Sequence, residues 1–416
     1  MFVRVPTPFV AIVAALVVIG SVSASHSAEP LTLAAAVDRT LRSNPDLAVL
    51  PARKLEQNAR IELAGLRPQL AIDAQIENAF GSGAYRDLNG TETSLSLSQV
   101  IELGDQRRKR LAAARDGMDT LELAQTVAQL DVVAETTRRY IELASEEQQR
   151  TLAAQWLAAS QRKTSEVERR VKAARDPEVE LVRAQIDLSR AELSVRAAAD
   201  RVRIAQRKLA AMWGATEPDF ERIDVDLFNL PNIEALQHRM EKIASSADFL
   251  LFATEIRQRE AEMALAKAQA RASITVSAGI RRLEATGDQA FIAGFSMPLA
   301  SARYAKPRIA EAQARRDGLE RERDAALIKA RASLFEVAAR LTHAVEEAQT
   351  LRDDLLPRME TAVTATEYAW QRGRYGYIEL TEAQREQLAL RLALITAATN
   401  AHLYRIEIER LTGDSP

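Results

Sequence analysis

The stretch that decides the fold is residues 181–212, LVRAQIDLSRAELSVRAAADRVRIAQRKLAAM. Apolar or small residues recur in it at steps of three and four, from Leu181 and Ala184 to Leu209 and Met212. These steps place one row of side chains along the seam of a coiled coil, and the frequent Ala lets two helices approach closely. We therefore expect a long helix whose seam packs against another helix.

The same pattern returns 199 residues later, in residues 380–411, LTEAQREQLALRLALITAATNAHLYRIEIERL. Only Gln387 interrupts its apolar series, and Gly413 stands where the first stretch has Gly214. Self-similarity at a fixed offset is the signature of a repeated structural unit. The sequence therefore predicts two structural repeats, residues 29–214 and 215–416.

A second long helix is expected upstream of each stretch. In the first repeat no Pro or Gly occurs between residues 118 and 175, and a helix over 105–173 would be about 100 Å long at ~1.5 Å per residue. The helical pattern breaks at Asp176-Pro177 in the first repeat and at Gly373 to Gly376 in the second. Each repeat is thus predicted to contain a long antiparallel helical hairpin.

Upstream of these helices, near residues 69–103 and 272–299, the apolar period changes to two. Alternation of this kind over about 9–11 residues is typical of a strand in a membrane barrel. Small polar residues alternate with the apolar ones, which suits a wet lumen. The side chains expected to face lipid are Ile72, Ile76, Leu95, Leu97, Val276, Phe291 and Phe295.

The N-terminus has the pattern of a secretory signal peptide over residues 1–28. Arg4 precedes an apolar run from Phe9 to Gly20, and small residues allow cleavage after Ala24 or Ala28. No later stretch is apolar enough for a spanning helix, so strands would have to cross any membrane. Export without a spanning helix points to the cell outer membrane, with a large periplasmic portion.

Four strands are too few to close a barrel. An open sheet edge in lipid leaves backbone N–H and C=O groups unpaired, at a cost of several kcal/mol each. Three protomers would pool twelve strands, the smallest such set with room for a passage. The expected fold is therefore mainly α with a membrane β-barrel contribution, closed in a homotrimer as a 12-stranded barrel and an α-helical barrel.

Composition excludes several other classes of protein. The net charge of -2 on an exported chain argues against nucleic-acid binding. The absence of Cys removes disulfides, thiolate metal ligands and thiol nucleophiles, and the four His are far apart in sequence. With no Walker motif and no Ser/His/Asp arrangement in view, we expect neither an enzyme, nor a cofactor, nor a bound metal.

A basic run, Arg107-Arg108-Lys109-Arg110, directly follows the first strand pair. Such a run is commonly the solvated start of a helix. It could equally contact phosphates at the inner leaflet of the membrane. The sequence leaves both interpretations open.

Several motifs resemble the TolC family of outer membrane efflux proteins over essentially the whole mature chain. They are Leu31-Thr32-Leu33 through Asn44-Pro45-Asp46-Leu47, Tyr368 through Gly373, Ala383-Gln384 and Leu411-Thr412-Gly413. The stretch from Leu97 to Gly104, followed by Arg107-Arg108, is similar to the CzcC-like branch that serves heavy-metal efflux pumps. The resemblance implies a passive homotrimeric duct in outer membrane lipid. It would work with a periplasmic adaptor and an inner-membrane pump of the resistance-nodulation-division type.

The resemblance also implies roles for residues at the helical breaks. Family members close the periplasmic end with an acidic ring, and Glu379 and Glu382 match its positions, where relatives often have Asp. The breaks themselves are expected to dock the adaptor. These adaptor-docking tips are Asp176 and Pro177 in the first repeat and Gly373, Arg374, Tyr375 and Gly376 in the second.

Two other functions remain open from the sequence. A duct of the same fold could carry drugs, or proteins in type I secretion, in place of metal cations. A periplasmic coiled coil without a pore would also fit the helical pattern. Conductance and heat-modifiable migration on gels distinguish a pore from a coiled coil.

Overall fold

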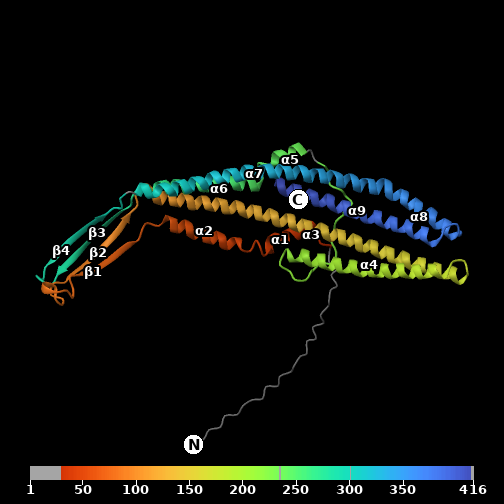
Figure 1. Ribbon diagram of the computed structural model, residues 1–416, viewed down its shortest axis with the longest axis horizontal. Helices are drawn as coiled ribbons and strands as arrows, with labels where there is room; N and C mark the ends of the chain where they lie inside the picture. The colour runs from red at the N-terminus through yellow and green to blue at the C-terminus, as the bar shows by residue number, and fades with distance from the viewer. Residues whose placement is uncertain (1–29, 234–235, 300, 414–416) are drawn as a thin grey trace, which may run out of the picture.

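The computed structural model describes residues 30–233, 236–299 and 301–413, so the signal peptide predicted over residues 1–28 lies outside it. These residues form an elongated body of long helices with a four-stranded sheet at one end (Figure 1). Over the described ranges, none of the helices combines the length and the apolar character that crossing a membrane requires.

The two parts of the chain contain the same series of elements. The first series is α1 (Leu33–Ser43), α2 (Leu50–Gly65), β1 (Leu70–Glu77), β2 (Glu92–Ile101), α3 (Gln106–Lys172) and α4 (Glu178–Ala211). The second is α5 (Leu236–Ile243), α6 (Ala247–Ala268), β3 (Ile274–Leu283), β4 (Gln289–Ser296), α7 (Ser301–Thr350), α8 (Leu356–Gln371) and α9 (Tyr377–Thr412). The ends of α3 and α8 are 199 residues apart, and so are the starts of α4 and α9.

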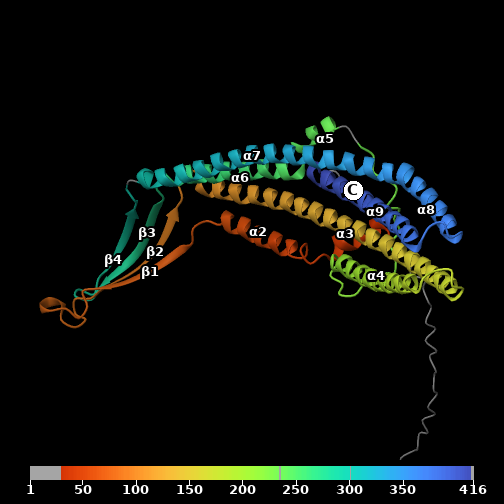
Figure 2. The ribbon, with the colours of Figure 1, turned by 45° about the vertical axis from the view of Figure 1, so that its right-hand side comes forward.

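The long hairpins form as the seam pattern predicts. Helix α3 has 67 residues and packs along α4, while α7 and α8 pack along α9 (Figure 2). The buried seam positions of α4 are Ala184, Ala191, Ala198, Val202 and Leu209. Because three of these are Ala, the helix backbones can lie close together along the whole hairpin.

The second long helix is not continuous. A π-helical turn, Leu351–Leu355, separates α7 from α8, and Pro357 is the second residue of α8. Proline has no N–H to complete the regular ladder, and the chain accommodates it with one wider turn. The extra residue in this turn shifts the seam, so Leu355, which continues the apolar series of α7, is exposed in the structure.

The sheet is antiparallel in the order β1-β2-β3-β4, as Figure 1 shows. Its register aligns Ile72, Leu97, Ala278 and Ala293 across the four strands. Since side chains alternate between faces, this register puts all seven residues expected to face lipid on one exposed face. The four predicted strands are therefore confirmed, and contact of this face with lipid stays a prediction.

The largest hydrophobic core lies near the middle of the helical body, where short segments from both parts meet. Tyr140 of α3 is buried there, and its hydroxyl oxygen lies 2.8 Å from the carbonyl oxygens of Leu31 and Asp224. A parallel bridge between Leu31 and Ile223 joins the same two segments. These contacts hold α1 and the connection between α4 and α5 against the long helices.

Candidate functional site at the helical tips

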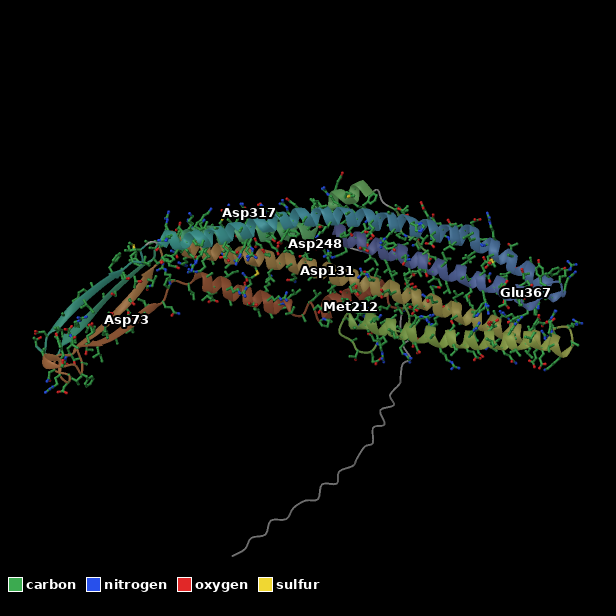
Figure 3. All side chains as sticks on the ribbon, viewed as in Figure 1. Asp73, Asp131, Met212, Asp248, Asp317 and Glu367 are labelled. Carbon is green, nitrogen blue, oxygen red and sulfur yellow. The ribbon has the colours of Figure 1, made fainter. Side chains whose placement is uncertain are left out.

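Both helical breaks lie at the end of the body opposite the sheet (Figures 1 and 2). Asp73 on the sheet and Glu367 of α8 mark the two ends in Figure 3. The predicted gate and the predicted docking residues therefore share one end of the molecule, formed by α3, α4, α8 and α9.

The first tip is closed by an ion pair that sequence reasoning missed. Arg170 at the end of α3 donates to both carboxylate oxygens of Asp176, over 2.7 and 2.9 Å. The same guanidinium lies 4.8 Å from the centroid of the Trp370 ring and donates to the carbonyl of Gln371. Asp176 therefore lies at the tip, as expected, but its carboxylate is buried against Arg170. Its spacing of six residues from Arg170 matches no helical period, so the sequence carried no signal for this pair.

The second tip exposes more of its predicted docking residues. Gly373 has a φ of 70°, a left-handed conformation that favours glycine, and its N–H donates to the carbonyl of Trp370. Arg374 and Tyr375 are exposed beyond this turn, and Gly376 precedes α9. Together with Pro177 of the first tip, they form the surface that a partner could reach.

The two predicted gate residues are exposed on the first turns of α9. Glu379 Oε2 lies 3.0 Å from the point that a Cβ on Gly376 would occupy, so any larger residue at Gly376 would crowd this carboxylate. The neighbouring hairpin contributes Glu180, which accepts a hydrogen bond from the backbone of Tyr377 at the start of α9. Burial, followed by the nearby Asp176, raises the pKa of Glu180.

Glu382 lies in a different electrostatic setting. It lines a cavity of about 300 Å³ between α4 and α9 together with Arg183, Arg190 and Arg385. Three guanidinium groups and the carboxylate of Asp187 thus line the same cavity as Glu382 within one protomer. Sequence reasoning found Glu382 but not the charged cavity that it lines, because the arginines come from both hairpins.

Behind the gate residues lies a buried polar cluster that joins α3, α4 and α9. Asp187 accepts hydrogen bonds from the Tyr377 hydroxyl over 3.0 Å and from Arg385 over 2.6 Å. Lys163 donates to the side-chain oxygen of Gln384 over 3.1 Å. Burial lowers the pKa of Lys163 to about 8, although the charge of Asp187 opposes this shift.

The only sequence signal for this cluster was a charge beside the seam. Asp187 directly precedes the seam position Leu188, and a carboxylate there has to be paired if the seam is tightly packed. Its partners, Tyr377 and Arg385, are 190 and 198 residues away. The cluster connects the hairpin that carries the gate residues to the other hairpin.

The polar face of the sheet carries a second set of charges that the sequence did not indicate. Arg281 of β3 pairs with Glu92 of β2 over 2.7 Å and with Glu77 of β1 over 3.0 Å. It also donates to Ser94 Oγ. One guanidinium thus ties three strands together at the end of the sheet that is farthest from the helices.

The basic run at the start of α3 is largely used within the protein. Arg107 Nε donates to the carbonyl of Gly65, and Arg110 donates to the carbonyls of Ala64 and Leu66. Arg110 also pairs with Glu102 over 2.6 Å. These contacts satisfy carbonyl groups at the end of α2, which have no partner within that helix.

Within the described ranges, no three His, Asp or Glu side chains are grouped so that they could hold a metal ion. What the described residues offer is a rod of paired hairpins, an acidic and exposed first turn on α9, and a sheet with one apolar and one polar face. This combination defines the class of outer membrane channels built from long helical hairpins.

Solved structures of that class share the fold. The outer membrane protein VceC of Vibrio cholerae matches 92% of this chain and 96% of its own at a TM-score of 0.75, with 16% identity. The open state of the MtrE outer membrane channel of Neisseria gonorrhoeae matches 92% of this chain and 89% of its own at a TM-score of 0.72, with 17% identity. The structure of CusC, whose description refers to transmembrane channel formation, matches 92% of this chain and 92% of its own. Its TM-score is 0.74, with 17% identity.

The sequence supports the same class. Residues 36–215 match the family described as outer membrane efflux protein. The cobalt-zinc-cadmium resistance protein CzcC of Cupriavidus metallidurans is 25% identical over 393 residues, which is 93% of this chain and 91% of that protein. These matches confirm the resemblance to outer membrane efflux proteins that its motifs indicate.

Proposed function

We propose that three copies of this chain assemble into a duct that crosses the outer membrane and continues through the periplasm. The observation that carries this proposal is the open sheet with one apolar and one polar face. Strands β1 and β4 are its outer strands, and the apolar face is exposed in the isolated chain. An exposed apolar face with two free edges is poorly suited to water, and it suits a barrel shared between copies in lipid.

In this assembly β4 of one copy would pair with β1 of the next, so that twelve strands close around a lumen. The seven predicted lipid-facing residues would contact the hydrocarbon, and the Ser-rich face with Arg281 would line the passage. The helical hairpins would close as an α-helical barrel in the periplasm. The two repeats, residues 29–214 and 215–416, would contribute equally to both barrels, after removal of a signal peptide over residues 1–28.

The tips would face the inner membrane. Pro177 and residues 373–376 would dock a periplasmic adaptor, since exposed loops at the end of a rigid scaffold are common binding sites. Because its carboxylate is paired with Arg170, Asp176 would shape the tip more than it contacts the partner. The energy for transport would come from an inner-membrane pump of the resistance-nodulation-division type, and the chain would act as a passive conduit without catalysis or cofactor.

Glu379 and Glu382 would form the periplasmic gate. They are three residues apart near the start of α9, so both project from nearly the same side of that helix. Three copies would bring six carboxylates together where the helical barrel tapers. Rings of acidic side chains favour cations in channels, which supports heavy-metal cations as the substrate class.

The metal substrate is also supported by the relative whose name refers to cobalt, zinc and cadmium resistance. A duct needs no tight metal site, because cargo has to leave as readily as it enters. A drug or protein duct of the same fold is the alternative, and transport measurements separate the two.

The duct is tested with the purified protein in planar bilayers. We expect an oligomer that migrates faster on gels before heating and discrete conductance steps that favour cations over anions. A protein that shows neither oligomer nor conductance would be a periplasmic coiled coil without a pore.

A further inference from the structure

Three segments lie where the sheet joins the helices: residues 60–69 at the end of α2, residues 101–110 at the start of α3, and residues 297–299 and 301–308 at the start of α7 (Figure 1). We call them the junction collar. Contacts hold the first two together, because Arg107 and Arg110 donate to the carbonyls that end α2. Both views show the start of α7 beside the sheet as well (Figure 2).

The charge of the collar differs from that of the whole chain. Residues 297–308 contain Arg303, Lys306 and Arg308 and no acidic residue, while the whole chain has a net charge of -2. All three side chains are exposed, and within the described residues none of them has an ion pair or a hydrogen bond. Farther along α7, Arg315 and Arg340 each pair with a glutamate one turn away.

Large apolar side chains are exposed beside these cations. Leu299 is 82% exposed and Tyr304 is 77% exposed. On the α2 side, Leu63 and Leu66 are exposed and line a groove of about 550 Å³ together with Arg60 and Arg67. The collar therefore combines aliphatic side chains, a tyrosine and several cations at the same end of the helices. This combination is typical of the interface between hydrocarbon and headgroups in membrane proteins.

The position of the collar along the molecule agrees with a location at the boundary between hydrocarbon and headgroups. Strand β3 has 10 residues, which span about 33 Å at ~3.3 Å per residue. A hydrocarbon core is about 30 Å thick. If the apolar sheet face lies in the hydrocarbon, the collar lies at one interface, on the side from which the helices extend.

The internal contacts decide which cations remain for a ligand. Arg107 and Arg110 are used by the carbonyls at the end of α2. Arg108 is bound to Asp105 and Arg60 to Glu56. Among the described residues, the three cations at the start of α7 have no such partner, and neither do Arg67 and Lys109. The start of α7 therefore carries the largest group of unpaired cations in the collar for a ligand of negative charge.

We propose that the junction collar binds the anionic headgroups of phospholipids in the periplasm-facing leaflet of the outer membrane, with Arg303, Lys306 and Arg308 as the main phosphate contacts and Leu299 and Tyr304 in the adjoining acyl region. The inference rests on the proposed outer membrane duct. It adds a lipid-binding site that anchors the duct at a fixed depth.

The test compares two triple variants of the full chain in detergent. The collar variant is Arg303→Gln/Lys306→Gln/Arg308→Gln. The control is Arg321→Gln/Lys329→Gln/Arg331→Gln, which removes three exposed cations from the same helix far from the sheet. Dioleoylphosphatidylglycerol is titrated into each, and the dissociation temperature of the oligomer is followed on gels.

We expect the lipid to raise this temperature for the wild type and the control at the same concentration. For the same rise in temperature, the collar variant should need a lipid concentration that is higher by about fivefold for each lost cation. The Arg303→Lys/Arg308→Lys variant should respond like the wild type, because Lys keeps the charge.

The proposal is overturned if the collar variant responds like the control, or if dioleoylphosphatidylcholine or inorganic phosphate acts as well as the anionic lipid. A failure of the lipid-binding proposal can be distinguished from a failure of the proposed duct. A wild type that conducts in bilayers but ignores the anionic lipid contradicts only the collar, whereas a wild type without oligomer and conductance contradicts the duct.

Discussion

The hydroxyl of Tyr377, at the first residue of α9, donates a hydrogen bond to the carboxylate of Asp187 on α4 over 3.0 Å. The same carboxylate accepts a second hydrogen bond from Arg385 of α9. One buried acid on the first hairpin thus holds two turns of the helix that carries the predicted gate residues. The position of Glu379 and Glu382 depends on this contact between hairpins.

Replacing Asp187 with Asn should loosen the start of α9. The change leaves Arg385 without its charged partner, and a hydrogen bond to a charged group contributes about 1.5–3 kcal/mol. Hydrogen exchange of the amides in residues 377–385 should accelerate accordingly. Arg190→Gln is the control, since Arg190 is mostly exposed and lies 3.9 Å from Asp187, and it should change exchange little. Equal exchange in both variants would mean that the Asp187 contact does not hold the helix.

The stability of the protein should rise with pH above about pH 8 because of Lys163. Burial lowers the pKa of Lys163 to about 8 from 10.5, so the unfolded chain binds more protons than the folded chain in this window. Between pH 8 and 10 the free energy of unfolding should rise by at most about 2–3 kcal/mol. Urea unfolding in detergent at both pH values measures the change.

Lys163→Met should abolish this rise, and the exposed Lys329→Met should leave it intact. The measurement ends at pH 10 because burial raises the pKa of Tyr377 to about 12, and tyrosines of this kind reduce stability at higher pH. A slope that persists in Lys163→Met would assign the pH dependence to another group.

An arginine at the centre of the apolar sheet face should prevent assembly, and one on the polar face should not. Leu97 faces the apolar side between Ile72 and Ala278, and its neighbour Ser96 faces the polar side. Leu97→Arg should cost about 2–4 kcal/mol near the middle of the bilayer, with a large loss of folded oligomer in the outer membrane, whereas Ser96→Arg should assemble.

The corresponding pair at the end of β4, Phe295→Arg and Ser296→Arg, should differ less. Phe295 is next to the last residue of the strand, and the cost of an arginine falls toward the interface. Similar oligomer yields from Leu97→Arg and Ser96→Arg would show that the apolar face does not contact lipid.

The double variant Glu379→Ala/Glu382→Ala should give a larger single-channel conductance and weaker block by multivalent cations added from the tip side. The reason is loss of the acidic ring at the narrowest part of the duct. Glu367→Ala, at the same end but on α8, serves as the control. If conductance and block stay unchanged in the double variant, these acids serve only as favourable charges near a helix N-terminus.

Cysteine cross-linking should place the adaptor at the helical tips. The chain has no Cys, so a single substitution provides a unique thiol. Tyr375→Cys, which is exposed at the second tip, should capture a co-expressed periplasmic adaptor. Thr286→Cys, at the opposite end between β3 and β4, should capture none, and capture from Thr286 alone would reverse the orientation of the duct.

The elements of the fold were predictable because they depend on local periodicity. The steps of three and four in residues 181–212 and the alternation around Leu95 and Leu97 are properties of consecutive residues, and each matches one backbone geometry. The offset of 199 residues then related the two hairpins. The location of Glu379 and Glu382 at the tip followed from the break at Gly373–Gly376.

What the sequence by itself determined was therefore the helices, the strands, the sidedness of the sheet and the end of the rod where a gate would lie. Only the tertiary structure decided which charges meet. Asp187 and Arg385 are 198 residues apart, and Arg281 and Glu77 are 204 apart. Such pairs depend on how one hairpin or strand is placed against another, and no local period carries that information. For the same physical reason, the basic run beside the sheet was ambiguous until Arg107 and Arg110 were seen to bind the carbonyls that end α2.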